Sequence, residues 1–310
     1  MLPRRSWRQW EPRFGFPIFK GMRSFISFSI RPDFAPLEFK KLVQEGTQAV
    51  RGGFSSTLAF VQKAAPLLIF NRNARIRFRI IFTTRDGKFL AMRRIADSYP
   101  PGGSIDVDLT DMLTRLGFQD DDYMAMMVMS KGRHDGVRSS PGSYSMTYRS
   151  PQSYSTYRTG GFTRILNDSR KKNHYGFRGI NPTVVSDTKR MSSLFLINHS
   201  SNPSYDESVT PVSLLLRPDG EKREAVFGAI PPFGGVERTM EDLFGSDVSD
   251  FLAPYRGRGT TITTCPGATL ASLHLIRARD NMSFSIEHSR PAHTYLLNGM
   301  PGTFYIDITL

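Results

Sequence analysis

The residues most able to carry chemistry are concentrated in the second half of the chain. Four of the six histidines lie within residues 193–310, and the densest polar segment is residues 287–293, which read Glu-His-Ser-Arg-Pro-Ala-His. A histidine beside a carboxylate titrates near neutrality and can serve as an acid–base pair. Several histidines with a glutamate can also hold zinc or iron, or hydrogen-bond a polar ligand. The residue types therefore leave catalysis, metal binding and ligand recognition open.

Spacing favours ligand recognition over the other two. The chain has no helical His-Glu-x-x-His pattern and no Gly-x-Ser-x-Gly nucleophile motif. On an extended strand Glu287 and His288 point to opposite faces, which counts against a joint acid–base role. We therefore predict no catalytic residue, no metal ligand and no cofactor. The predicted ligand-binding residues are His288, Arg290, Glu287, His293, His199, Asn198 and His274.

A second candidate is a strip of tyrosines and arginines between residues 144 and 158. It contains Tyr144, Tyr148, Tyr154, Tyr157, Arg149 and Arg158. Aromatic faces of this kind can stack on bases or on sugar rings. The plainer interpretation is a strand whose tyrosines are half-exposed, and we favour it.

The elements that must position these residues occur twice. An Asp-Gly turn at 86–87 precedes Pro-Pro-Gly-Gly at 100–103 and Leu-Thr-Asp-Met-Leu at 109–113. Asp-Gly recurs at 219–220, before Pro-Pro-Phe-Gly-Gly at 231–235 and Met-Glu-Asp-Leu-Phe at 240–244. Each series also closes alike, since residues 145–148 with Pro151 match residues 285–288 with Pro291. Such self-similarity predicts two copies of one structural unit, with Tyr148 and Ser150 in the places of His288 and Arg290.

Short alternating strands joined by Gly/Pro turns predict a mainly β fold with two tandem β-sandwich domains related by internal duplication. Apolar residues at helical spacing predict a helical segment before them. The expected parts are a basic leader at 1–35, a helical segment at 36–66, copy 1 at 67–160, a linker at 161–192 and copy 2 at 193–310.

Charge and composition limit the partners. Net charge is +11 for residues 1–80, +6 for 81–190 and −4 for 191–310, so only the front of the chain suits a polyanion such as RNA. The basic leader could be a transit segment, a tail that meets anionic surfaces, or translation upstream of a start at Met22.

Cys265 is the single cysteine, which excludes a disulfide framework and fits a cytoplasmic protein. No apolar run approaches the length of a membrane span.

The second copy resembles the sensory rhodopsin transducer-like superfamily. The resemblance is carried by residues 266–273 and 285–290, with residues 194–198 and the turn at 218–220 similar to the family's opening strands. It implies a compact β-sandwich that binds carbohydrate-like small molecules and often self-associates, with His288 and Arg290 in or beside the site.

These observations predict a non-catalytic protein whose second β-sandwich binds a polar small molecule or sugar, with a homo-oligomer as a possible assembly. One alternative is an enzyme, of hydrolase or isomerase type, that uses Glu287 and His288. A second is an assembly protein whose basic leader contacts RNA or another polyanion.

Overall fold

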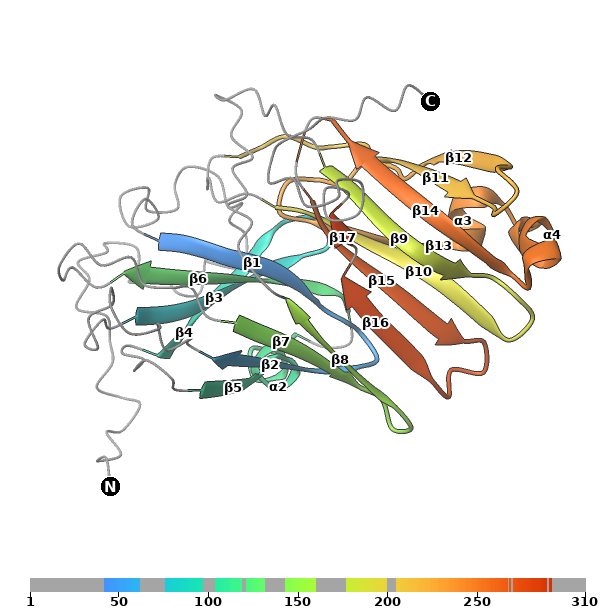
Figure 1. Ribbon diagram of the computed structural model, residues 1–310. Coiled ribbons are helices and arrows are strands. Elements are labelled where there is room, and N and C mark those ends of the chain that lie inside the picture. Colours follow the sequence, from blue (N-terminus) through green and yellow to red (C-terminus); the bar gives the residue numbers. More distant parts are fainter. Residues whose placement is uncertain are drawn as a thin grey trace, which may run out of the picture.

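The computed structural model describes residues 42–61, 76–96, 104–118, 121–131, 143–159, 177–199, 205–266, 268, 270–288 and 290–291. Within these ranges the protein is mainly β, with four antiparallel sheets and a few short helices (Figure 1). The predicted basic leader at 1–35 lies outside the described residues.

The first half contains two four-stranded sheets. In one sheet the strand order is β1 (Leu42–Val50), β6 (Tyr123–Lys131), β3 (Ile76–Thr84) and β4 (Phe89–Ala96). In the other it is β5 (Ser104–Asp108), β2 (Ser55–Val61), β7 (Ser143–Arg149) and β8 (Tyr154–Thr159). A short helix, α2 (Leu109–Thr114), follows β5.

The second half repeats this order with additions. One sheet runs β12 (Lys222–Val226), β11 (Val212–Leu216), β14 (Arg258–Cys265), β9 (Phe177–Val185) and β17 (Arg290–Pro291). The other runs β13 (Gly235–Thr239), β10 (Arg190–Asn198), β15 (Leu270–Ala278) and β16 (Phe284–His288). After β13 come α3 (Met240–Phe244), α4 (Val248–Leu252) and the 3₁₀ turn η4 (Ala253–Tyr255).

The repeated motifs occupy equivalent places in the two halves. Gly87 N–H donates to the Thr84 carbonyl (3.0 Å) in the β3–β4 turn, and Gly220 N–H donates to the Arg217 carbonyl (3.1 Å) in the β11–β12 turn. Both glycines have positive φ, of 80° and 91°. The repeated five-residue motifs form α2 and α3, and each helix has an oxygen-bearing N-cap side chain, from Asp108 and Thr239 respectively.

The predicted boundaries need three corrections. Residues 42–50 and 55–61, within the predicted helical segment 36–66, form strands β1 and β2 of the first half. Residues 177–185, within the predicted linker 161–192, form β9, the first strand of the second half. The third concerns the closing match, because residues 145–148 lie in β7 whereas residues 285–288 lie in β16.

Strand pairing gives the equivalence that motif matching missed. Strand β2 lies between β5 and β7 as β10 lies between β13 and β15, so β7 corresponds to β15 and β8 to β16. The N-cap residues anchor the register, since Thr57 pairs with Asp108 and Ser193 with Thr239. Counting from there, Tyr148 corresponds to Ile276, because they pair with the equivalent residues Ser56 and Ser192.

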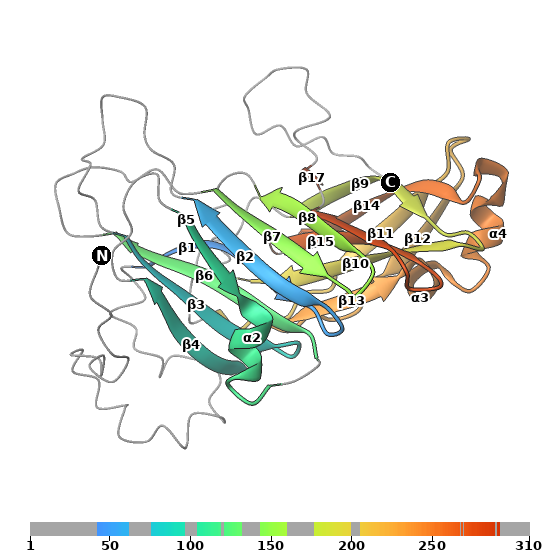
Figure 2. The same ribbon diagram turned by 90° about the horizontal axis from the view of Figure 1, so that it is seen from below.

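The described residues form two apolar cores, and one of them joins the halves. One lies inside the second half, between its two sheets and α3 and α4. The other is shared, because it combines side chains of both first-half sheets with residues of the β13–β10–β15–β16 sheet. Strand β10 alternates between them: Leu194 and Leu196 pack in the former, and Phe195 and Ile197 in the latter. Figure 2 shows β10 and β15 lying between the first half and the outer strands of the second.

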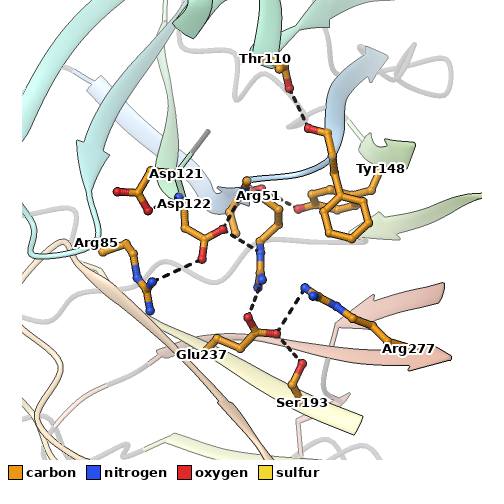
Figure 3. A network of polar contacts seen from close by, with 12 residues as sticks. Arg51, Arg85, Thr110, Asp121, Asp122, Tyr148, Ser193, Glu237 and Arg277 are labelled. Atoms are coloured by element: carbon orange, nitrogen blue, oxygen red, sulfur yellow. Dashed lines mark hydrogen bonds and ion pairs between the residues drawn. The ribbon is translucent and has the colours of Figure 1, made fainter. Parts of the chain in front are cut away.

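Polar contacts cross the same interface (Figure 3). Arg51 is buried and pairs with Asp122 (Nε to Oδ1, 3.0 Å) and with Glu237 of the other half (2.5 Å). Burial works against ionisation of Glu237, but the charge of Arg51 and hydrogen bonds from Arg51 and Ser193 outweigh it and lower the pKa of that carboxyl. Gly235 N–H also donates to the Arg85 carbonyl (2.9 Å), so backbone contacts join the halves as well.

Candidate functional site

Two of the predicted site residues meet on neighbouring strands of the second half. His274 of β15 pairs in register with Glu287 of β16, and His274 Nδ1 lies 3.4 Å from Glu287 Oε1. His274 Nε2 lies 3.0 Å from the Ser192 hydroxyl of β10. We call Ser192, His274 and Glu287 the Ser–His–Glu chain.

The backbone also contacts this chain. Val185 N–H donates to Ser192 Oγ (2.8 Å), and Ser192 Oγ and His274 Nε2 share a hydrogen bond whose donor depends on the tautomer of His274.

The order resembles that of a serine hydrolase triad, but it does not suit catalysis. Ser192 has no exposed surface and His274 is 1% exposed, so no substrate can reach the hydroxyl. Only Glu287, whose side chain is 59% exposed, meets solvent. The arrangement can therefore orient an exposed carboxylate from a buried, hydrogen-bonded base.

Two further predicted site residues, Asn198 and His199, lie elsewhere. In β10, Leu194 is the residue opposite His274, and Asn198 and His199 follow four and five positions later. Five residues of strand span about 16 Å, so His199 is remote from the Ser–His–Glu chain. Asn198 is fully buried and donates to the carbonyls of Glu207 (2.9 Å) and Ile230 (3.1 Å), while it accepts from Tyr205 (2.9 Å). These bonds tie a loop to β10.

His199 is also buried, and desolvation lowers its pKa to about 3. It is therefore neutral at physiological pH.

The remaining predicted residues are placed by their backbone pairing. His288 pairs in register with Leu273, and Arg290 of β17 pairs with Ile180. His293 lies outside the described residues.

Among the described residues of the first half, no Ser–His–Glu chain occupies the equivalent positions. In register, Met146 of β7 corresponds to His274, and Tyr157 of β8 corresponds to Glu287, since each pair is directly cross-strand. Both first-half residues are buried in the shared core. The polar pair is thus a property of the second half alone.

Strand β16 also borders the first half. It packs beside β8, and Ile286 N–H donates to the Ser155 hydroxyl (3.0 Å). Both strands begin at hairpin turns at the same end of the molecule and run the same way (Figure 1). Ile286 and Tyr157 face the shared core. Strand alternation therefore places four residues on the opposite faces, and we call them the junction strip: Tyr154, Thr156, Ser285 and Glu287.

All four junction-strip residues are exposed, and Tyr154 is the most exposed large apolar side chain described, at 73%.

The tyrosine–arginine strip contains both buried and exposed tyrosines. Tyr148 and Tyr157 are core residues whose rings stack 6.1 Å apart, and the Tyr148 hydroxyl donates to the Ala49 carbonyl (2.6 Å). Sequence reasoning included Tyr154 in the strip but could not separate it from its buried neighbours, and it missed Ser192 altogether.

One pocket lies on the first half, near the interface. Its volume is about 40 Å³, and it lies where the β1–β2 turn meets α2 and the start of β6, lined by Val50, Arg51, Gly52, Gly53, Phe54, Thr110, Leu113, Thr114, Phe118, Asp121 and Tyr123. Arg51 is committed to Asp122 and Glu237. Thr110 accepts from Ser56 N–H (2.8 Å). Most polar groups of this pocket thus have structural partners.

Among the described residues no three His, Cys, Asp or Glu side chains cluster as metal ligands would. Within the same ranges no helix is long and apolar enough to cross a bilayer. Cys265 is buried.

No family model and no curated protein matches the chain. Among solved structures, a glycosyl hydrolase family 2 member from Bacteroides cellulosilyticus DSM 14838 is 7% identical, with a TM-score of 0.18 over 79% of this chain and 28% of that one. A Bacteroides uniformis beta-glucuronidase is 10% identical, with a TM-score of 0.16 over 78% of this chain and 25% of that one. The chain thus spans about a quarter of their lengths. TM-scores this low carry no argument about fold or function.

Proposed function

We propose that the protein is a non-catalytic binding protein whose second β-sandwich holds a polar, carbohydrate-like small molecule at the edge formed by β16. The observation that carries the proposal is the Ser–His–Glu chain, in which a buried histidine orients an exposed carboxylate. A carboxylate fixed in this way can accept hydrogen bonds from two hydroxyl groups of one ligand. Sugars present such hydroxyl pairs.

The difference between the halves supports a site in the second half only. If the halves arose by duplication, as their shared strand order suggests, the polar pair has no counterpart because Met146 and Tyr157 occupy its places. The resemblance to the sensory rhodopsin transducer-like superfamily implies the same kind of ligand. Complete burial of Ser192 argues against a hydrolase that would use this serine as its nucleophile.

The test compares the full chain with Glu287→Gln, a change that removes the charge and keeps the shape. Binding would be measured by calorimetry and ligand-detected NMR with methyl glycosides of glucose, galactose, mannose, N-acetylglucosamine and glucuronic acid. We expect one of these probes to bind, and Glu287→Gln to weaken it by about tenfold or more, as loss of a charge-assisted hydrogen bond would.

The matched control is Glu224→Gln on β12, which is the same substitution at an exposed strand position of the other sheet. It should leave binding unchanged. Absence of binding by every probe at millimolar concentration, or equal affinity of the Glu287→Gln protein and the unmodified chain, would overturn the proposal.

A further inference from the structure

The ligand site need not end at the boundary between the halves. Strands β8 and β16 come from different halves, yet the Ser155 hydroxyl accepts from Ile286 N–H (3.0 Å) and lies 3.4 Å from the Ile286 carbonyl. One serine side chain thus contacts both backbone groups of a single residue on the neighbouring strand. This contact fixes the relative position of the two strands without a backbone ladder between them.

The contact at Ser155 sets which residues of the junction strip are neighbours. Because both strands run the same way (Figure 1) and Ser155 lies beside Ile286, Tyr154 is nearest to Ser285 and Thr156 is nearest to Glu287. The strip therefore has an aromatic ring at one end and a carboxylate at the other, with hydroxyl groups between them. The Thr156 hydroxyl is held by a hydrogen bond with Thr147 (2.8 Å).

Exposure of Tyr154 has no structural explanation among the described residues. Large apolar side chains that are mostly exposed there are Tyr154, Val226 and Met282. Of these, only Tyr154 belongs to the junction strip. Arg149, also exposed, is its cross-strand neighbour on β7. An aromatic face beside hydrogen-bonding groups suits a ligand with one apolar face and several hydroxyls.

We propose that the ligand lies along the junction strip and is a pyranoside whose apolar C–H face stacks on Tyr154 while its hydroxyls hydrogen-bond Glu287 and Ser285. This inference rests on the proposed function, and it adds that the site is composite: the first half supplies the stacking surface and the second half the carboxylate. A free polar molecule without an apolar face, such as an amino acid, would not use Tyr154.

The test uses the full chain and the same methyl glycosides. Tyr154→Ala should weaken binding about three- to tenfold, as loss of a stacked aromatic does, whereas Tyr154→Phe should stay within about twofold because it keeps the ring. Melting temperatures should not move, since Tyr154 is exposed. Val226→Ala removes another exposed apolar side chain, from β12, and serves as the control.

The outcomes separate the two proposals. If Glu287→Gln weakens binding and Tyr154→Ala does not, the composite site is wrong and the second-half site stands. If Tyr154→Ala weakens binding but Tyr154→Phe does so equally, the phenol hydroxyl and not the ring is used, which overturns the stacking assignment. If neither Glu287→Gln nor Tyr154→Ala has an effect, both proposals fail.

Discussion

His199 makes the stability of the protein depend on pH. Its pKa of about 3 in the folded protein lies below the ordinary value of 6.5, because burial disfavours the charged ring. The unfolded chain therefore binds a proton at a pH where the folded chain does not. Stability from this residue is fully present above pH 6.5, and it falls as the pH drops from 6.5 towards 3.

We expect the free energy of unfolding to fall by about 1.4 kcal/mol per pH unit in that window from His199 alone. His199→Gln, which cannot be protonated, should have a shallower slope by that amount. Urea unfolding at pH 7.5, 6.5, 5.5 and 4.5 measures both slopes. Equal slopes for the two proteins would show that His199 is not a buried, neutral residue.

At this scale the sequence named two residues that meet in the structure. It listed both His274 and Glu287 as candidates, and the two pair across β15 and β16. It could not predict that Ser192 would meet His274, because the two residues are 82 positions apart. Nor could it exclude Asn198 and His199, since a polar residue after a strand looks alike whether it binds a ligand or anchors a loop.

Among the elements, the two Asp-Gly turns differ in their surroundings. A Cβ on Gly87 would lie 1.9 Å from the Pro232 carbonyl oxygen, whereas a Cβ on Gly220 would have nothing within 4 Å. The β3–β4 turn is therefore packed against the segment before β13, and the β11–β12 turn is open. Equivalent glycines are thus required for different reasons.

This contrast predicts unequal effects of one substitution. Gly220→Ala should cost about 1–2 kcal/mol, the strain of a left-handed residue with a side chain. Gly87→Ala should cost that amount plus the loss of close contact between the halves, at least about 2 kcal/mol more. Denaturant unfolding of both variants measures the difference. Similar losses would mean that the contact at Pro232 contributes little.

The sequence located elements where it carries clear turns, and it failed where only a short pattern of apolar residues indicated a helix. The Asp-Gly turns lie where the sequence placed them, and the matched motifs at 109–113 and 240–244 form equivalent short helices, which the sequence did not predict. Apolar residues in 36–66 suggested a helix, but residues 55–59 of β2 alternate in burial, with Ser56 and Leu58 inward. Strands β7 and β16 share an alternating pattern, so a four-residue match could not show which strands are equivalent. Only pairing register decides that.

For the whole molecule, the shared core predicts that the halves unfold together. The face of the β13–β10–β15–β16 sheet that the first half covers carries apolar side chains from three strands: Phe195, Ile197, Leu273, Leu275 and Ile286. An isolated second half, residues 177–291, would expose them, and we expect it to self-associate and to bind a hydrophobic dye.

The first half itself supplies the control. Its residues at four of these positions in register are Ala59, Ser145, Thr147 and Thr156, none of which is buried. An isolated second half with Phe195→Ala, Leu273→Ser, Leu275→Thr and Ile286→Thr should be less associated by size-exclusion chromatography and bind less dye. In the full chain the same four changes should destabilise both halves in one transition. Two separate transitions in the unmodified chain would contradict the shared core.

The unequal outer faces also limit how many units such a chain can stack. The second unit has an apolar face that accepts a neighbour, whereas the corresponding face of the first unit is polar and half-exposed, with Thr57, Ser145 and Thr147. Among the described residues of that face Tyr154 is the only large apolar side chain, so a further unit placed ahead of the first would find little apolar surface on which to dock. Adding a unit there would require apolar substitutions on that face of the first unit. The polar side chains of the first unit thus close one side of the pair, as a capping repeat closes a solenoid.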